Sequence, residues 1–283
     1  MKLSVDTKNR MEFINLPLFR LVVLALLITS CKNNQNEQEL ESGIVDNCWD
    51  IADSSSTDNR ENGDFTAPFT SIPVQIDGCG KDQIWEASSW YGMNYLWMGE
   101  KVNTTDYQGK FKLAWDENYL YLLVMVEDDT LHPTLQDGIE NYWKGDYVEV
   151  FIDEDKSGGD HKFNHQAFAY HISTEGHAID QSTQQKPIFL DDHINVSRAQ
   201  KGNTYLWEIA IQLYDKDFDD QDLSNNEPIK LTAQKEIGFS IAYGDNDGNN
   251  LRENFMGSKK NHGTNNDDGY INSDVFGSLL LIK

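Results

Sequence analysis

The feature of this sequence that most restricts its fold is a series of short apolar runs whose side chains alternate in character. In "KFKLAW", Phe111, Leu113 and Trp115 alternate with Lys110 and Lys112. Successive residues of a strand point to opposite faces of a sheet, so this pattern predicts strands with one buried face. No stretch keeps a helical period. The runs predict strands at 110–115, 119–128, 146–153, 166–173, 205–213, 237–245 and 276–283.

The turns between these runs favour antiparallel pairing. In "WDENY", Asp116, Glu117 and Asn118 separate two apolar runs. Asp and Asn tolerate the left-handed backbone of a tight hairpin turn. We therefore predict an all-β, antiparallel β-sandwich of jelly-roll or immunoglobulin-like type over residues 67–283, preceded by a disordered leader.

The N-terminus resembles a bacterial lipoprotein signal. Basic residues precede the apolar run "LVVLALLITS" at 21–30, which is shorter than the roughly 20 residues that a membrane span needs. Residues 1–30 are therefore predicted to be a signal peptide. The end of this run, "ITSC", resembles a lipobox, which predicts a lipid on Cys31; Lys32 after it favours the outer membrane. The alternative is an ordinary signal peptide with a chance cysteine.

Residues 31–66 are rich in Asn, Glu, Ser and Asp, as in "NNQNEQELES". Such a composition buries too little apolar surface to offset the entropy of ordering, so we expect a flexible tether. A second acidic stretch, at 215–228, predicts a long loop. Cys48 and Cys79 remain after Cys31, and an exported chain makes a disulfide between them plausible.

The net charge of −24 narrows the class of partner. Nucleic acids and anionic membrane surfaces would repel such a chain. Neutral ligands and divalent cations remain compatible with it.

The order of motifs along 72–283 resembles that of the family 9 carbohydrate-binding modules, which are found attached to xylanases and in sugar-binding lipoproteins. No single motif is diagnostic, but the order is. The resemblance implies a β-sandwich that holds the end of a sugar chain between two aromatic rings and does no chemistry. A pyranose presents C–H groups on its faces and hydroxyls at its rim, which suits this arrangement. The motifs are "IDGCGKDQIWEAS", "LAWDENYLYLLVMVEDD", "WKGDYVEVFIDED", "YLWEIAIQL", "IGFSIAYGD" and "VFGSLLLIK".

The resemblance places the two clamp aromatics at Trp143 and Tyr270, and the strand carboxylate that accepts sugar hydroxyls at Glu149. Alternation puts Glu149 on one face with Tyr147 and Phe151, away from the aliphatic face. Two alternatives stay open. In the first, Trp143 is a core residue that anchors a loop. In the second, Glu149 is a structural carboxylate.

This sequence departs from the family at several polar ligands. The family's arginine is Ala169 here, an asparagine is His171, a glutamine is Ala242 and a loop asparagine is Asp267. The lost arginine removes a charged donor to the sugar rim. We expect His171 and Asp245 to compensate, and Asp267 to face the ligand.

The sequence also suggests a bound metal ion. In "DEDKSGGD", Asp153, Asp155 and Asp160 are candidate calcium ligands, because the acidic spacing resembles the first half of a calcium loop. Asn164 stands where an EF-hand has its bidentate glutamate, so this is not an EF-hand. A solvated acidic loop is the alternative. Histidines 161, 165, 171 and 177 lack helical spacing and cysteine partners, which disfavours zinc.

Two other functions stay open. Related sandwiches bind haem b through Met and His, and the chain has 6 Met and 7 His but no c-type attachment motif. The second alternative is a role as an accessory part of a glycoside hydrolase system. We expect a non-catalytic glycan-binding lipoprotein of the outer membrane, on its periplasmic or surface face, that assists polysaccharide capture for glycoside hydrolases or glycan transporters.

Overall fold

The computed structural model describes residues 57–104, 106–248, 251–260 and 267–283. These residues belong to one compact unit, Glu41–Lys283. The predicted signal peptide, Cys31, Cys48 and most of the predicted tether lie outside the described residues. In the segments described, no helix has both the length and the apolar character needed to cross a membrane.

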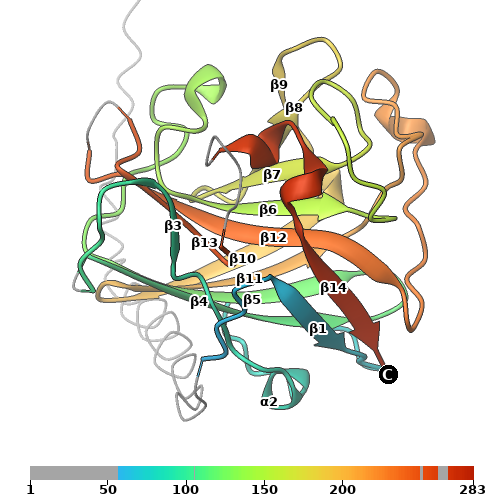
Figure 1. Cartoon of the computed structure of the whole chain (residues 1–283), viewed down its shortest axis with the longest axis horizontal. Coiled ribbons are helices and arrows are strands. Elements are labelled where there is room, and N and C mark those ends of the chain that lie inside the picture. The colour runs from blue at the N-terminus through green and yellow to red at the C-terminus, as the bar shows by residue number, and fades with distance from the viewer. Residues whose placement is uncertain (1–56, 105, 249–250, 261–266) are drawn as a thin grey trace, which may run out of the picture. The chain divides into compact units, whose positions relative to one another are not determined.

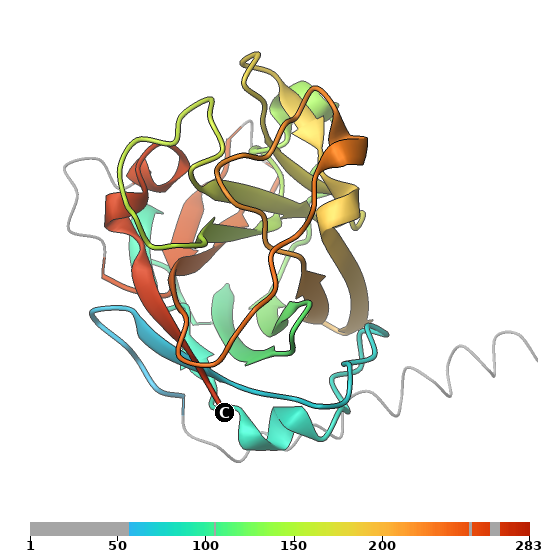
Figure 2. The same ribbon diagram turned by 90° about the vertical axis from the view of Figure 1, so that its right-hand side faces the viewer.

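The fold is the expected β-sandwich, with two sheets facing each other (Figures 1 and 2). The first, here called the A sheet, has the order β10-β11-β5-β4-β2, and its described pairings are antiparallel. Its strands are β2 (Tyr91–Gly92), β4 (Tyr107–Trp115), β5 (Leu120–Asp128), β10 (Ile194–Lys201) and β11 (Thr204–Ile211).

The second, here called the B sheet, has the order β1-β14-β12-β6-β7-β8-β9, with β13 beside β12 and β3 beside β13. The pairing of β1 with β14 is parallel, which departs from the expectation of purely antiparallel strands. The strands are β1 (Asp64–Pro68), β3 (Tyr95–Gly99), β6 (Tyr147–Asp153), β7 (Phe168–Ser173), β8 (Ala178–Gln181), β9 (Pro187–Phe189), β12 (Glu236–Asp245), β13 (Asn254–Gly257) and β14 (Gly277–Ile282).

Alternate residues of both sheets form the core between them. Phe111 and Leu113 of β4 meet Val148, Val150 and Ile152 of β6 in one cluster. Each of these five side chains is at most 2% exposed. Burial of their apolar surface, at about 25 cal/mol per Å², is the main driving force that holds the sheets together. The opposite face of β6 is thereby directed outward, as the alternation predicted for Glu149.

The outer face of the A sheet is also covered, although the sequence predicted one buried face. The segment before β2 packs there through Trp85, which lies in the short helix α2 (Ile84–Ala87). Glu208 of β11 anchors it by accepting hydrogen bonds from Trp85 Nε1 at 2.9 Å and from the backbone N–H of Gly78 at 3.1 Å. Cys79 in this segment is disulfide-bonded. Its predicted partner, Cys48, is outside the described residues.

Each predicted run overlaps one observed strand, and the predicted hairpin turn is present. Asp116 Oδ1 accepts from the N–H groups of Asn118 and Tyr119 at 2.7 and 2.8 Å, which fixes the β4–β5 turn. The predicted acidic loop at 215–228 holds one short 3-10 turn. The 3-10 turns are η1 (Ile139–Asn141), η2 (Asp191–His193), η3 (Leu223–Asn225), η4 (Asp268–Tyr270) and η5 (Ser273–Val275).

Candidate functional site

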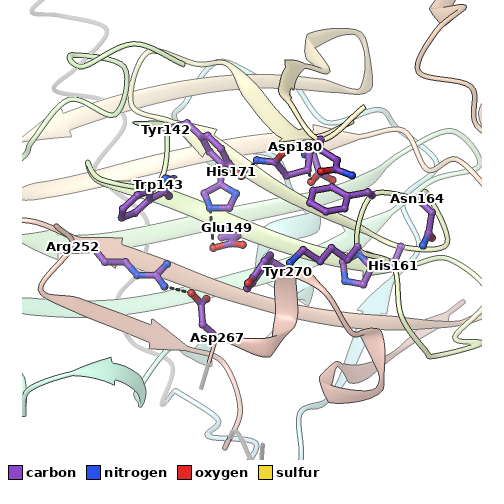
Figure 3. A pocket seen from close by; sticks show the side chains of 15 residues that line it. Tyr142, Trp143, Glu149, His161, Asn164, His171, Asp180, Arg252, Asp267 and Tyr270 are labelled. Carbon is purple, nitrogen blue, oxygen red and sulfur yellow. Dashed lines mark hydrogen bonds and ion pairs between the residues drawn. The ribbon is translucent and has the colours of Figure 1, made fainter. Parts of the chain in front are cut away.

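A pocket of about 450 Å³ opens on the outer face of the B sheet (Figure 3). Its floor comes from β6 and β7. Its walls come from the turn after η1, from η4, from β8 and from the segments that join β6 to β7 and β12 to β13. Five of the six predicted ligand residues line it. These are Trp143, Glu149, His171, Asp267 and Tyr270.

Trp143 projects from the turn between η1 and β6. Asp146 pins this turn, because its carboxylate accepts hydrogen bonds from the backbone N–H groups of His132 and, at 2.7 Å, of Asn246. Gly145 allows the turn to lie against the preceding loop, where an added Cβ would be 2.6 Å from Thr134 Cα. Trp143 is 38% exposed, so it is not a buried core residue.

Tyr270 ends η4 on the other side of Glu149 in the close-up (Figure 3). His161 holds this turn through a 2.9 Å hydrogen bond between its Nε2 and the carbonyl oxygen of Gly269. Gly269 itself rests on Phe151, whose Cε1 lies 2.9 Å from the position of an added Cβ. Tyr270 is 41% exposed. The pocket therefore has an exposed aromatic ring on each side of a buried carboxylate.

Glu149 forms the floor and is 1% exposed. Its Oε2 has no hydrogen-bond partner among the described residues. A buried polar atom left without a partner costs about 1–3 kcal/mol. Burial, reinforced by the nearby Asp267, raises the pKa of the Glu149 carboxyl well above its ordinary value. The arrangement suits a ligand that brings hydrogen-bond donors to this oxygen.

His171 stands beside Glu149 and is neutral. Its Nε2 lies 3.3 Å from Glu149 Oε2 without hydrogen-bond geometry, and its Nδ1 lies 3.3 Å from the carbonyl oxygen of Ala169. Burial, together with the charge of Arg252, lowers the pKa of His171 to about 3. The contact with Glu149 is therefore not a pair of full charges. It places one polar nitrogen next to the carboxyl.

Arg252 is a pocket residue that the sequence reasoning missed. It follows the β12 strand and donates to Asp267 Oδ2 at 2.6 Å (Figure 3). It also donates to the Tyr147 hydroxyl at 2.5 Å. A basic residue in the otherwise acidic and amide-rich stretch "DNDGNNLREN" was the available signal. The sequence does not show, however, that the loop carrying Arg252 runs toward the pocket.

The far wall carries a second buried acceptor that was not predicted. Asp180 of β8 accepts from the backbone N–H groups of Ala169 and Gln181 at 2.9 and 2.6 Å. Burial raises the pKa of Asp180 to about 7. Gln181 Nε2 also donates to the Tyr142 hydroxyl at 3.0 Å. This wall thus presents fixed polar groups opposite the arginine.

Asp245, predicted as a sugar ligand, does not line the pocket. It ends β12, where carboxylate oxygens of Asp245, Asp128 and Asp247 lie within 4.8 Å of one another. Asp106 and Glu253 form an overlapping group with Asp245. Asp245 is 2% exposed, and its Oδ2 has no hydrogen-bond partner among the described residues. Its surroundings are therefore a group of carboxylates that is separate from the pocket.

The predicted calcium ligands make hydrogen bonds within their own loop. Asp153 accepts from the backbone N–H of Gly158 at 2.7 Å, Asp155 from that of Ser157 at 3.0 Å, and Asp160 from that of Lys162 at 2.8 Å. They are not among the described carboxylates that converge within 4.8 Å. Calcium at this loop stays a prediction.

Haem and zinc gain no support from the described residues. The described side chains lining the pocket include no methionine, which a Met/His haem site would use. The convergent metal-type groups found in the described parts of the chain consist of carboxylates without histidine.

A two-sheet sandwich with a pocket that holds a buried carboxyl between exposed aromatic rings has the features of a carbohydrate-binding β-sandwich. A family model described as "Carbohydrate family 9 binding domain-like" matches residues 76–283. The chain belongs to this family.

Known relatives and solved structures agree with the family. The chain is 28% identical over 203 residues to endo-1,4-beta-xylanase A of Thermotoga maritima, a match that covers 71% of this chain and 16% of the xylanase. It is 28% identical over 198 residues to endo-1,4-beta-xylanase C of Paenibacillus barcinonensis, covering 66% and 16%. The matches thus span a small part of these enzymes.

The likeness to solved structures concerns the fold. A family 9 carbohydrate-binding module of Caldicellulosiruptor kristjanssonii in complex with cellotriose has a TM-score of 0.54 at 20% identity, covering 77% of this chain and 93% of the module. A protein of Bacteroides uniformis has a TM-score of 0.51 at 8% identity, and the match covers 77% of this chain and 98% of that protein.

Proposed function

We propose that this chain binds the end of a glycan, without catalysis, between Trp143 and Tyr270, with Glu149 as acceptor. The observation that carries the proposal is the unpartnered, buried Oε2 of Glu149 between two exposed aromatic rings. The rings suit the apolar faces of a pyranose and the carboxyl suits its hydroxyls. Each ring face contributes only a few kcal/mol, so moderate affinity is expected.

The relatives suggest the class of glycan. Solved members of the family are described in complex with glucose and with cellotriose, and the curated relatives are endo-1,4-beta-xylanases. A neutral β-linked plant polysaccharide is therefore our candidate ligand. With the lipid anchor predicted at Cys31, the chain would hold such a glycan at the outer membrane for glycoside hydrolases or transporters.

We further propose a calcium ion at the group of carboxylates around Asp245. Calcium prefers carboxylate oxygens, and the unpartnered Oδ2 of Asp245 fits a cation ligand. Burial, with the charges of Asp128 and Asp106, raises the pKa of Asp245 to about 8; a cation bound there would lower it. Asp128, Asp247 and Glu253 would complete the site.

The sugar-binding proposal is tested with Trp143→Ala on a glycan array, followed by calorimetry with the best ligand. We expect binding to fall below detection while the thermal unfolding midpoint stays nearly unchanged, because Trp143 is partly exposed. Phe189→Ala is the matched control, since Phe189 is 43% exposed and does not line the pocket. Unchanged binding by Trp143→Ala would remove this ring from the site.

A further inference from the structure

The guanidinium of Arg252 is fixed at the edge of the pocket. It donates to Asp267 and to the Tyr147 hydroxyl, and its Nη2 lies 3.0 Å from Met98 Sδ. Its Cζ also stands 4.1 Å from the centre of the Phe255 ring. The side chain of Arg252 is 10% exposed. It is therefore a preorganised group, held in one geometry before any ligand arrives.

Small residues of β12 provide the room for this arrangement. Gly244 pairs with Tyr147, and a Cβ on Gly244 would lie 2.6 Å from Tyr147 Cζ. The tyrosine ring thus lies directly on the glycine. Ala242, the next residue on this face, pairs with Glu149. With no long side chain from β12 over this part of the sheet, Tyr147 and Arg252 occupy the space beside Glu149.

The other buried polar groups of the pocket are mainly hydrogen-bond acceptors, so a sugar bound there also needs a charged hydrogen-bond donor. Glu149, Asp180 and Asp267 supply acceptor oxygens, and His171 is neutral. A sugar hydroxyl can donate one hydrogen bond and accept two, so acceptors alone satisfy only one of its three possible hydrogen bonds. Arg252 and Asp267 together present a donor and an acceptor side by side, which suits hydroxyls on adjacent ring carbons.

We propose that Arg252 is the charged donor to the ligand and that its pairing with Asp267 restricts the pocket to neutral sugars. This inference rests on the proposed glycan-binding function. The charge of Arg252 is matched by Asp267 at 2.6 Å, while Glu149 and Asp180 add further carboxyls. A uronic acid would bring its carboxylate into a pocket whose described lining offers no cation besides the paired Arg252 and the exposed Lys162.

The test is a panel of neutral oligosaccharides, cellotriose among them, and of oligosaccharides bearing glucuronic or galacturonic acid. The wild type binds neutral members. Arg252→Ala lowers their affinity by about tenfold or more, as expected for loss of charge-assisted hydrogen bonds. Arg252→Lys recovers only part of the lost affinity, because lysine keeps the charge but lacks the planar fork of hydrogen-bond donors. Arg60→Ala, at an exposed ion pair with Asp58, leaves the affinity unchanged.

A second variant separates recognition from folding. Asp267→Asn keeps the shape of the pair but leaves the charge of Arg252 unmatched. The ratio of uronate to neutral-sugar affinity then rises several-fold, a gain that a merely destabilised pocket does not produce. An unchanged ratio, a wild type that prefers uronates, or Arg252→Ala binding within twofold of wild type overturns the inference.

The outcomes also separate this inference from the proposed function. Glycan binding that is lost in Trp143→Ala but unaffected in Arg252→Ala retains the function and removes Arg252 from recognition. A wild type that binds no member of a broad glycan array removes both.

Discussion

The conflict between stability and binding is sharpest at Glu149. Its carboxyl is buried, lacks a partner for Oε2 among the described residues, and has a pKa raised by burial and by Asp267. A carboxyl whose pKa is higher in the folded than in the unfolded chain stabilises the fold fully at pH below its unfolded pKa. That contribution is lost as pH rises through the folded pKa. Native structure at neutral pH thus bears a cost at this residue, which a ligand would offset.

Glu149→Gln is therefore expected to separate the two properties. The amide removes the need to bury a charge, so the free energy of unfolding at pH 7–8 stays equal or increases, and the difference from wild type grows as pH rises. Glycan affinity falls by about tenfold or more, because the amide leaves only one of the two acceptor oxygens. Denaturant unfolding at several pH values and calorimetry measure both. The exposed Glu140→Gln is the control, and a large loss of stability in Glu149→Gln would contradict this account.

At the scale of elements, sequence pattern predicts those strands that bury one complete face. Runs such as 119–128 and 146–153 alternate or are continuously apolar, and β5 and β6 fall inside them. The strands that the sequence pattern did not predict form only because they pair with a neighbouring strand. β3 is bounded by a glycine and pairs with the short β13, and β10 carries Asn, Ser, Arg and Gln on a sheet edge. Pairing in the tertiary structure, which local sequence does not encode, determines whether these segments form strands.

The same limit explains which residues of the site could be predicted from the sequence. Trp143 and Glu149 belong to one short motif around β6, so the resemblance to the family could place both of them at the site. Arg252 reaches the pocket because the β12–β13 connection folds back over the sheet, and no local pattern predicts that path. Asp245 was misplaced for a related reason. The last residue of a strand projects toward the loops, and here it joins other carboxylates instead of the pocket.

The η4 turn gives an element-scale prediction, since Gly269 fixes the height of Tyr270 above the sheet. In Gly269→Ala the new Cβ would lie 2.9 Å from Phe151 Cε1, so the turn must move. We expect glycan affinity to fall several-fold and the free energy of unfolding by about 1–2 kcal/mol. Adding Phe151→Leu, which removes the ring below, should restore part of the affinity. If the double variant binds no better than Gly269→Ala, the turn does not act through this contact.

At the scale of the whole molecule, the carboxylates around Asp245 lie where the two sheets meet. Asp128 ends β5 of the A sheet and Asp245 ends β12 of the B sheet. The Tyr243 hydroxyl of β12 already donates to Asp128 Oδ2 at 2.6 Å. Like charges gathered at such a junction repel one another across the sandwich. A divalent cation bound there would convert this repulsion into a link between the sheets.

Calcium should therefore stabilise the whole domain and not the pocket alone. A ligand that binds only the native state at about 100 times its Kd adds about 2.7 kcal/mol to the free energy of unfolding. We expect the thermal midpoint to rise with calcium, to fall with chelator, and to become insensitive to both in Asp245→Asn. Asp137→Asn, an exposed acid away from the group, keeps the wild-type response. Equal calcium responses in wild type and Asp245→Asn would place the ion elsewhere, with the Asp153 loop as the next position to test.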